Sequence, residues 1–362
     1  MSNEIKIGNR VIGDGHPCFI TFEAGPTHSG LESAKRLVKH TADAGADAVK
    51  FQIFRPDNLV ADRSLTYTYQ VLANKESGDM ETVTEPLYNI FVRRHLADEE
   101  WLALKAYADS LGLAFFATIG DDDGFDLVQR MDCHSIKVAS ADVNHHPFIR
   151  KIARTGVCIQ LDTGSSSLGE IEAAVDLIQA EGNHNIVIHN CPSGYPARLE
   201  SINLRMIPLI KQNFGCPAAF SDHTPGWEMD VAAVAMGANL VEKTITEDRC
   251  TRSVEHVMSL EPPEMSRFVK TIREVEVAMG SCRRVMTSEE REYRLKYRRS
   301  VYLEEAAHPG QRLDDVRVSF KRPGYGLQPD QYEKVQDYLF RDAHEAGDRV
   351  ELHHLMPSGP KE

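Results

Sequence analysis

The stretch CFITFEAGPTHSGLESAKRLVKHTADAGADAVKFQIF, residues 18–54, contains one unit of the predicted fold. Its two ends, CFITFEAG (18–25) and DAVKFQIF (47–54), are short apolar runs that are typical of buried strands. Between them, LESAKRLVKHTADAG has the residue pattern of a helix that ends at a glycine. A strand, a helix and a second strand in this order form a βαβ unit with parallel strands.

Six further apolar runs continue this alternation of strand and helix. They are LAFFATIG (113–120), SIKVAS (135–140), VCIQLDTG (157–164), NIVIHNCPSG (185–194), CPAAFSDH (216–223) and NLVEKTIT (239–246). Eight strands that are each followed by a helix predict a (β/α)₈, or TIM, barrel, which takes roughly 250 residues.

The domain boundaries follow from a change in sequence character after Gly280. The chain becomes basic and then short and strand-like, with turn signals at HPGQ and RPGYG. We predict a barrel domain over 1–285, a linker at about 281–290 and a small second domain over 291–362. The segment 55–97 is too long for an ordinary loop of the barrel, and we expect it to form a lid or another excursion that faces the substrate.

Composition limits the class of protein. The chain has 362 residues, 42% of them hydrophobic, and a formal net charge of −13. This acidity argues against nucleic acid or an anionic membrane surface as the main partner. No run approaches the roughly 18 apolar residues of a membrane span, and the first residues do not resemble a secretion signal. Seven scattered cysteines favour reduced thiols, so we expect a cytoplasmic protein.

Reactive side chains gather at the carboxyl ends of the predicted strands, where TIM-barrel enzymes carry their active sites. They are Glu23, Lys50, Gln52, Thr118, Lys137, Ser140, Asp162, Thr163, Ser193, Tyr195, Ser221, Asp222, His223, Glu242, Lys243 and Thr244. Buried ammonium groups need anions, because leaving them unpaired is costly. Lys50 and Lys137 could hold a phosphate and a carboxylate of a ligand, or they could pair with carboxylates of the chain such as Glu23, Asp142 or Asp162.

Several motifs resemble one family in their order along the chain. FEAGPTHSG with AGADAVKFQ, then SIKVAS, CPSGYPA, FSDHT and KRPGYG, resemble the N-acetylneuraminate (sialic acid) synthase family, which includes legionaminic and pseudaminic acid synthases. The resemblance implies a TIM barrel followed by an antifreeze-like (SAF) domain. It also implies an enzyme that condenses phosphoenolpyruvate with an N-acylated amino-sugar aldehyde, similar to N-acetylmannosamine, and water. The products would be a sialic-acid-like nonulosonate and phosphate.

The resemblance also implies roles for individual residues. The residues expected to bind phosphoenolpyruvate are Lys50, Lys137, Ser140, Ser193 and Ser221. Glu23 would be the acid beside the reacting carbons, and the remaining substrate-binding positions are Gln52, Thr118, Asp142, Asp162, Tyr195 and Glu255. His223 would hold a divalent metal, Mn²⁺ or Mg²⁺. Arg322, in KRPGYG, would enter the active site of the other subunit of a domain-swapped homodimer.

This chain departs from the family pattern at several positions. The second metal-binding histidine is replaced by Thr244, and a hydroxyl is a poor ligand for a transition metal. His256 could supply the missing imidazole. Without a metal, Lys243 or a protonated His223 could polarise the aldehyde. Asp142 stands in place of a glutamate, Asp162 in place of a serine or threonine, and Thr27 in place of an asparagine, and a shorter or more acidic pocket suggests a different sugar.

Two other functions stay open at this point. One is a Schiff-base aldolase on the same barrel with Lys50 or Lys137 as the nucleophile, since a lysine of lowered pKa suits that chemistry. The other is a non-catalytic relative that keeps only ligand binding, which the missing histidine makes worth testing.

Overall fold

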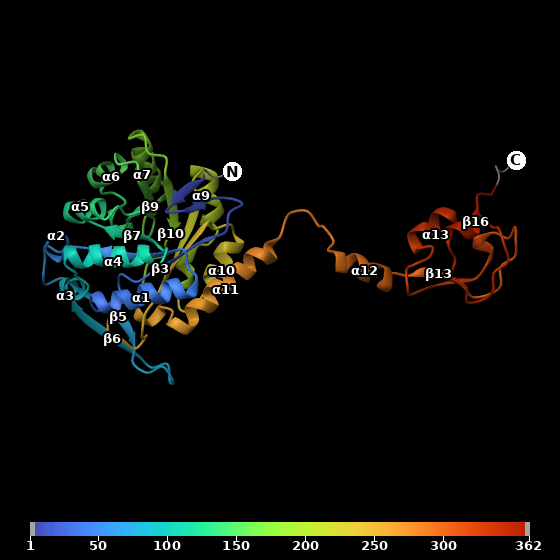
Figure 1. Cartoon of the computed structure of the whole chain (residues 1–362), viewed down its shortest axis with the longest axis horizontal. Coiled ribbons are helices and arrows are strands. Elements are labelled where there is room, and N and C mark those ends of the chain that lie inside the picture. Colours follow the sequence, from blue (N-terminus) through green and yellow to red (C-terminus); the bar gives the residue numbers. More distant parts are fainter. Residues whose placement is uncertain (1–3, 359–362) are drawn as a thin grey trace. The chain divides into compact units, whose positions relative to one another are not determined.

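The computed structural model describes residues 4–358, and these fall into two compact units that divide after Gly280 (Figure 1). The division lies beside the linker predicted at 281–290. None of the described helices is long and apolar enough to cross a membrane. All seven cysteines are free thiols, and five of them are buried.

The first unit is a closed barrel of eight parallel strands, which confirms the predicted TIM barrel. Every predicted apolar run contains one strand of the barrel. The strands are β3 (Phe19–Glu23), β4 (Ala48–Ile53), β7 (Ala114–Ile119), β8 (Ser135–Val138), β9 (Cys158–Asp162), β10 (Ile186–Asn190), β11 (Ala218–Asp222) and β12 (Leu240–Thr244). The barrel closes where β12 pairs with β3, so that Thr244 lies beside Glu23.

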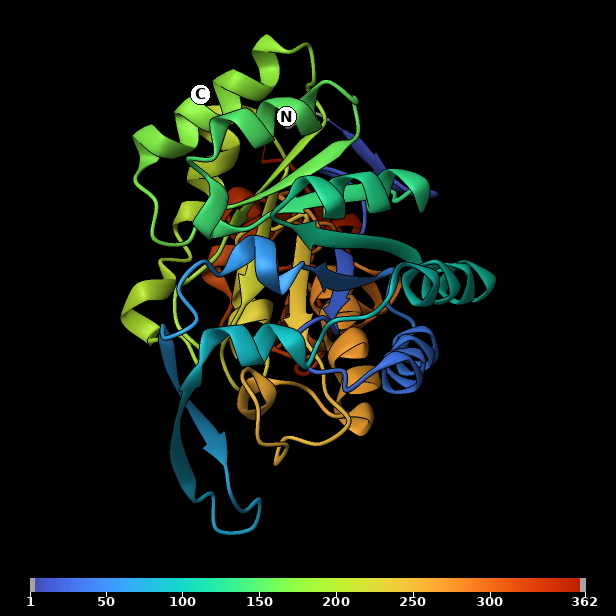
Figure 2. The ribbon, with the colours of Figure 1, turned by 90° about the vertical axis from the view of Figure 1, so that its left-hand side faces the viewer.

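Helices surround the barrel and cover the outward-facing side chains of its strands (Figure 2). The longer helices are α1 (Leu31–Ala44), α4 (Asp98–Ser110), α5 (Asp122–Arg130), α6 (His146–Ala153), α7 (Leu168–Ala180), α9 (Met206–Phe214), α10 (Glu228–Ala235) and α11 (Pro262–Met279). Their ends follow local sequence signals. Helix α1 stops at Gly45, which has φ 80°, and Ser167 and Glu170 form a capping box at the start of α7.

A hairpin that precedes the barrel closes its amino-terminal end. Strands β1 (Ile5–Ile7) and β2 (Arg10–Ile12) pair antiparallel and bury three isoleucines against the first residues of the barrel strands. Phe19 and Leu240 are among these contacts. A functional cavity is therefore left to the opposite, carboxyl-terminal end.

The segment 55–97 folds over the carboxyl-terminal end of the barrel. It contains α2 (Pro56–Leu59), the hairpin of β5 (Thr66–Leu72) and β6 (Met80–Pro86), and α3 (Leu87–Val92). The hairpin projects beyond the helices in Figure 2. Tyr69 and Val71 of β5 and Ile90 of α3 pack against Val254. Tyr195 lies beside this cluster. The excursion thus has a small core of its own next to residues predicted to bind substrate.

The second unit is built from short elements around a separate core. Strands β13 (Ser300–Leu303) and β14 (Val318–Lys321) pair antiparallel, as do β15 (Leu339–Phe340) and β16 (Leu355–Met356). Its helices are α12 (Ser288–Tyr297) and α13 (Pro329–Val335). The short helix α8 (Leu199–Ile202) belongs to the first unit. Val301, Leu313 and Phe340 are fully buried in this second core.

Candidate active site

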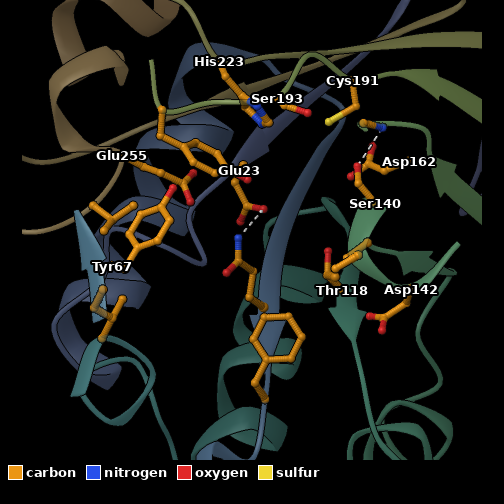
Figure 3. Close-up of a pocket in the computed structure, with 18 of the residues that line it drawn as sticks. Glu23, Tyr67, Thr118, Ser140, Asp142, Asp162, Cys191, Ser193, His223 and Glu255 are labelled. Atoms are coloured by element: carbon orange, nitrogen blue, oxygen red, sulfur yellow. Dashed lines mark hydrogen bonds between the residues drawn. The ribbon is translucent and has the colours of Figure 1, made fainter. Parts of the chain in front are cut away.

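A cavity of about 670 Å³ lies at the carboxyl ends of the barrel strands (Figure 3). Most of the residues predicted from the sequence line it. They are Glu23, Lys50, Gln52, Thr118, Ser140, Asp142, Asp162, Ser193, Tyr195, His223 and Glu255. Lys137 and Ser221 lie beneath its wall, and Thr244 and His256 are also outside the lining. The structure therefore gathers the predicted set, while the roles of its members stay predictions.

A network of buried charges forms the floor of this cavity. Lys50 contacts Glu23 and places its Nζ 3.0 Å from Oε1 of Glu242. Lys137 donates to the same Oε1 atom at 2.6 Å, and its Nζ lies 2.9 Å from Oδ2 of Asp162. Both lysines thus pair with carboxylates of the chain, one of the two arrangements left open by the sequence. Of the two lysines, Lys50 lines the cavity and Lys137 lies outside its lining.

Glu242 was not assigned a site role from the sequence, yet it joins the two lysines. It was visible only as one polar residue at the end of a strand. Its Oε2 atom has no hydrogen-bond partner among the described residues. Burial alone would raise the pKa of Glu242, but the ammonium groups of Lys137 and Lys50 outweigh burial and hold that pKa well below its usual range. Glu242 is therefore a permanent anion that fixes both cations.

Glu23 is the carboxyl group best placed to exchange a proton. Burial raises its pKa, and the nearby charge of Lys50 offsets only part of that effect. The backbone N–H of Gly25 donates to its Oε1 atom at 2.6 Å, and the amide of Gln52 donates to its Oε2 atom at 3.5 Å. Figure 3 shows Glu23 near the centre of the cavity, with the dashed line marking the contact from Gln52. Its position and raised pKa suit a general acid or base.

Hydroxyl groups form another side of the cavity. Ser140 accepts a hydrogen bond from the backbone N–H of Gly164 at 2.9 Å, and the hydroxyls of Ser165 and Ser193 lie 2.7 Å apart. A Cβ atom at Gly164 would come within 2.7 Å of the Ser140 hydroxyl, so only glycine allows this close approach. Ser165 and Gly164 were not predicted as site residues, although Gly164 ends the predicted run VCIQLDTG and Ser165 directly follows it.

The single imidazole in the cavity lining is neutral. Burial lowers the pKa of His223, and its Nδ1 atom lies 3.0 Å from the carbonyl oxygen of Pro192. This contact assigns the ring proton to Nδ1 and leaves Nε2 as an acceptor. Lys243 is fully buried, bonded to Asp222 and to the carbonyl of Thr224. Neither arrangement favours the polarisation of an aldehyde by Lys243 or a protonated His223, and that role stays a prediction.

The side chains do not fit the expected divalent-metal site. Among residues 4–358, no group of three or more histidine, cysteine, aspartate or glutamate side chains is arranged to hold a metal ion. Thr244 occupies the place where the resemblance implies a second imidazole. His256 does not replace it, because its Nδ1 atom is hydrogen-bonded to the Thr246 hydroxyl at 2.7 Å and it lies outside the cavity lining.

Arg94 is a further residue of the cavity that the sequence analysis missed. It follows α3, it is 7% exposed, and its Nε and Nη2 atoms lack hydrogen-bond partners within the described part of the chain. Tandem arginines at the end of a helix usually indicate an exposed surface, so the residue pattern did not indicate a site role for Arg94. Glu255 is near enough to Arg94 for their charges to interact. It has φ 74°, which is uncommon for a residue other than glycine.

Arg322 belongs to the second unit. Its side chain is exposed, and its guanidinium lies 5.5 Å from the centre of the Tyr297 ring. Its predicted entry into the active site of another subunit stays a prediction.

Fold and cavity together define the class of the protein, a TIM-barrel protein whose cavity is lined by a lysine, a central carboxyl group and hydroxyls. The chain belongs to the NeuB family, whose model matches residues 37–284. The resemblance stated from the sequence is thereby confirmed.

Similar proteins agree with this assignment. Protein MJ1065 of Methanocaldococcus jannaschii is 34% identical over 90% of this chain and 90% of its own. The N,N'-diacetyllegionaminic acid synthase of Legionella pneumophila is 30% identical over 92% of this chain and 93% of its own. A crystal structure of N-acetylneuraminic acid synthetase from Leptospira borgpetersenii, in complex with citrate, matches with a TM-score of 0.70 and 28% identity, and covers 81% of this chain and 95% of that chain.

The buried carboxyl group of Glu255 predicts a pH-dependent stability. Burial raises its pKa from 4.5 to about 7, so the folded protein keeps this proton up to a higher pH than the unfolded chain does. Its ionisation therefore reduces stability as pH rises from about 4.5 to 7. Relative to the wild type, we expect Glu255→Gln to gain on the order of 2 kcal/mol in unfolding free energy over this range, measured by urea denaturation.

The exposed Glu172, on α7, offers a matched control. Glu172→Gln removes one exposed carboxyl group and is the reference for the loss of a formal charge. A difference for Glu255→Gln that changes with pH no more than the difference for Glu172→Gln would contradict the assigned pKa.

Proposed function

We propose that this protein condenses phosphoenolpyruvate with an N-acylated amino-sugar aldehyde and water to give a nonulosonate and phosphate. The observation that carries the proposal is the arrangement of Lys50, Glu23 and the serine hydroxyls around one cavity in a member of the NeuB family. The relatives named as legionaminic acid and N-acetylneuraminic acid synthases support the same reaction class.

In this proposal the hydroxyl side of the cavity holds phosphoenolpyruvate. Ser140, Ser193 and the unpredicted Ser165 donate hydrogen bonds to phosphate oxygens, and Lys50 offsets the negative charge. Lys137 lies outside the cavity lining and holds Glu242 and Asp162 in place through ion pairs, so it is a positioning residue. Such fixed groups favour reaction because they hold the ligand in one orientation.

The acceptor sugar then lies between Glu23 and the segment 55–97. Gln52 and Tyr195 line this part, and burial raises the pKa of Tyr195 well above its usual value, so its hydroxyl stays a hydrogen-bond donor. Thr118, Asp142 and Asp162 complete the lining near phosphoenolpyruvate. An acceptor in this position brings its aldehyde carbon next to the enol carbon.

The proposed chemistry is balanced as follows. C3 of phosphoenolpyruvate bonds to the aldehyde carbon, and the aldehyde oxygen takes up a proton. Water adds at C2 and releases one proton, and the C2–O bond to phosphate then breaks while the new C2 hydroxyl passes its remaining proton to the departing phosphate and becomes the keto group. Glu23 transfers the protons, because it lies at the centre of the cavity and burial raises the pKa of its carboxyl group. No step is assigned to a metal, since the side chains of the cavity do not fit one.

The Schiff-base alternative is less compatible with the charges of the site. Burial would lower the pKa of Lys50, but the carboxylates of Glu23 and Glu242 outweigh burial and raise it above its ordinary value. An ammonium held by two carboxylates is a poor nucleophile. Borohydride trapping with pyruvate would reveal this activity if it existed.

We also propose the domain-swapped homodimer that the resemblance implies. Arg322 supports it, because its exposed guanidinium contacts an aromatic ring and is free to reach a carbonyl or hydroxyl of a bound sugar.

The central test is the release of phosphate from phosphoenolpyruvate with a panel of six-carbon amino sugars. We expect Glu23→Gln to lower kcat by about 10²- to 10⁴-fold, since general acid–base catalysis typically contributes that much. Glu172→Gln should behave as the wild type does. Release with no sugar would contradict the synthase activity, and binding of phosphoenolpyruvate without any turnover would favour a non-catalytic relative.

A second expectation concerns metal ions. Because the cavity lacks a second imidazole, we expect phosphate release to change less than about twofold when EDTA or Mn²⁺ is added. A loss of activity in EDTA that Mn²⁺ restores would show that other groups hold a catalytic metal.

A third expectation follows from the proposed dimer. Glu23→Gln and Arg322→Ala should each be nearly inactive, but a sample refolded from an equal mixture should recover about a quarter of wild-type activity. Half of the dimers are then mixed, and each has one intact site of two. If the mixture stays as inactive as its components, Arg322 does not act across subunits.

A further inference from the structure

Arg94 has the properties of a ligand-binding residue that lacks its ligand. It lines the cavity, it is 7% exposed, and two of its guanidinium nitrogens have no hydrogen-bond partner among residues 4–358. Leaving a buried cation without partners is costly. A guanidinium fork is best satisfied by two oxygens of one carboxylate or phosphate group.

The surroundings do not satisfy Arg94. No carboxylate of the described residues forms an ion pair with it, and the nearest acidic influences are Glu255 and Glu23. Burial raises the pKa of both carboxyl groups, and Glu23 is already paired with Lys50. His28 is neutral, because burial and the charge of Arg94 lower its pKa to about 4. His256 has a pKa lowered in the same way, also to about 4.

The position of Arg94 indicates which part of a substrate it would meet. Arg94 comes one helical turn after Ile90, which packs on Val254 next to Glu255. Figure 3 shows Glu255 and Tyr67 across the cavity from Ser140 and Asp142, with Glu23 between the two sides. The phosphoenolpyruvate side and the Arg94 side are thus opposite ends of one cavity, and the reacting carbons lie between them.

The walls near Arg94 strengthen its effect. Leu87, Ile90 and Val254 pack together and line the cavity with apolar surface. An ion pair formed there is screened less than in water, so a charged group on a ligand gains more from Arg94 than a hydroxyl would.

We infer that Arg94 binds an oxyanion, a phosphate or a carboxylate, on the end of the acceptor sugar remote from its aldehyde. The acceptor class is then an anionic N-acylated amino sugar. This inference rests on the proposed synthase function and adds the charge of the second substrate. Arg94 is the residue that selects for that charge.

The test compares three acceptors that differ at C6: N-acetylmannosamine, its 6-phosphate and the corresponding 6-carboxylate. Their kcat/KM values are measured from phosphate release with phosphoenolpyruvate. We expect at least one anionic acceptor to exceed the neutral sugar by about 100-fold, and the comparison of the two anions identifies the oxyanion. Arg94→Ala should abolish this preference, and Arg94→Lys should retain part of it.

Arg93→Ala is the matched control, because Arg93 is adjacent in sequence but pairs with Glu85 at the surface. It should leave the preference for an anionic acceptor unchanged. A wild type that prefers the neutral sugar, or an Arg94→Ala variant that loses activity equally on all three acceptors, would overturn the inference and leave the synthase activity standing.

If no acceptor supports phosphate release, the binding of the same three sugars is measured by calorimetry. This measurement tests the role of Arg94 independently of catalytic activity. Binding of an anionic sugar that Arg94→Ala removes and Arg93→Ala preserves would support the role of Arg94 while the proposed synthase function fails. Binding that does not depend on Arg94, or no binding at all, would overturn the inference.

Discussion

The structure depends on one oxygen atom, Oε1 of Glu242, which holds the ammonium groups of both Lys50 and Lys137. These three residues come from β12, β4 and β8, so the contact joins strands from different parts of the barrel wall. Removing one member of such a buried ion pair typically costs about 3–5 kcal/mol, because the other charge is left uncompensated. The same contact sets the orientation of Lys50 and thereby of Glu23, and so it links the stability of the barrel to the geometry of its cavity.

The fold was predictable because its signal is repeated and local. Eight apolar runs with helices between them leave few alternatives to a closed parallel barrel. The two hairpins were less accessible. Strands β1 and β2 are three residues each, and β6, METVTEP, does not alternate polar and apolar residues, although its partner β5 does in TYTYQV. Both hairpins form because they pack against surfaces that only the finished barrel provides.

The candidate site was predictable as a set of residues but not as a set of contacts. Strand ends identified Glu23, Lys50 and Ser140, since the barrel brings all such positions together. Which carboxylate meets which lysine depends on the stagger of the strands, and this hid the role of Glu242. Arg94 was hidden for another reason, because its burial depends on how the segment 55–97 folds back. Thr244 was the opposite case, because the absence of an imidazole at this position was visible from the sequence.

The hairpin of β1 and β2 also limits how small molecules can reach the cavity. Because its isoleucines seal the amino-terminal end, small molecules that reach the buried charges have to enter and leave at the opposite end. Two substrates and two products would then share one entrance, and the deeper ligand would have to arrive before the one that sits above it. In a barrel that is closed at one end, the depth at which each substrate binds therefore decides the order in which the substrates bind.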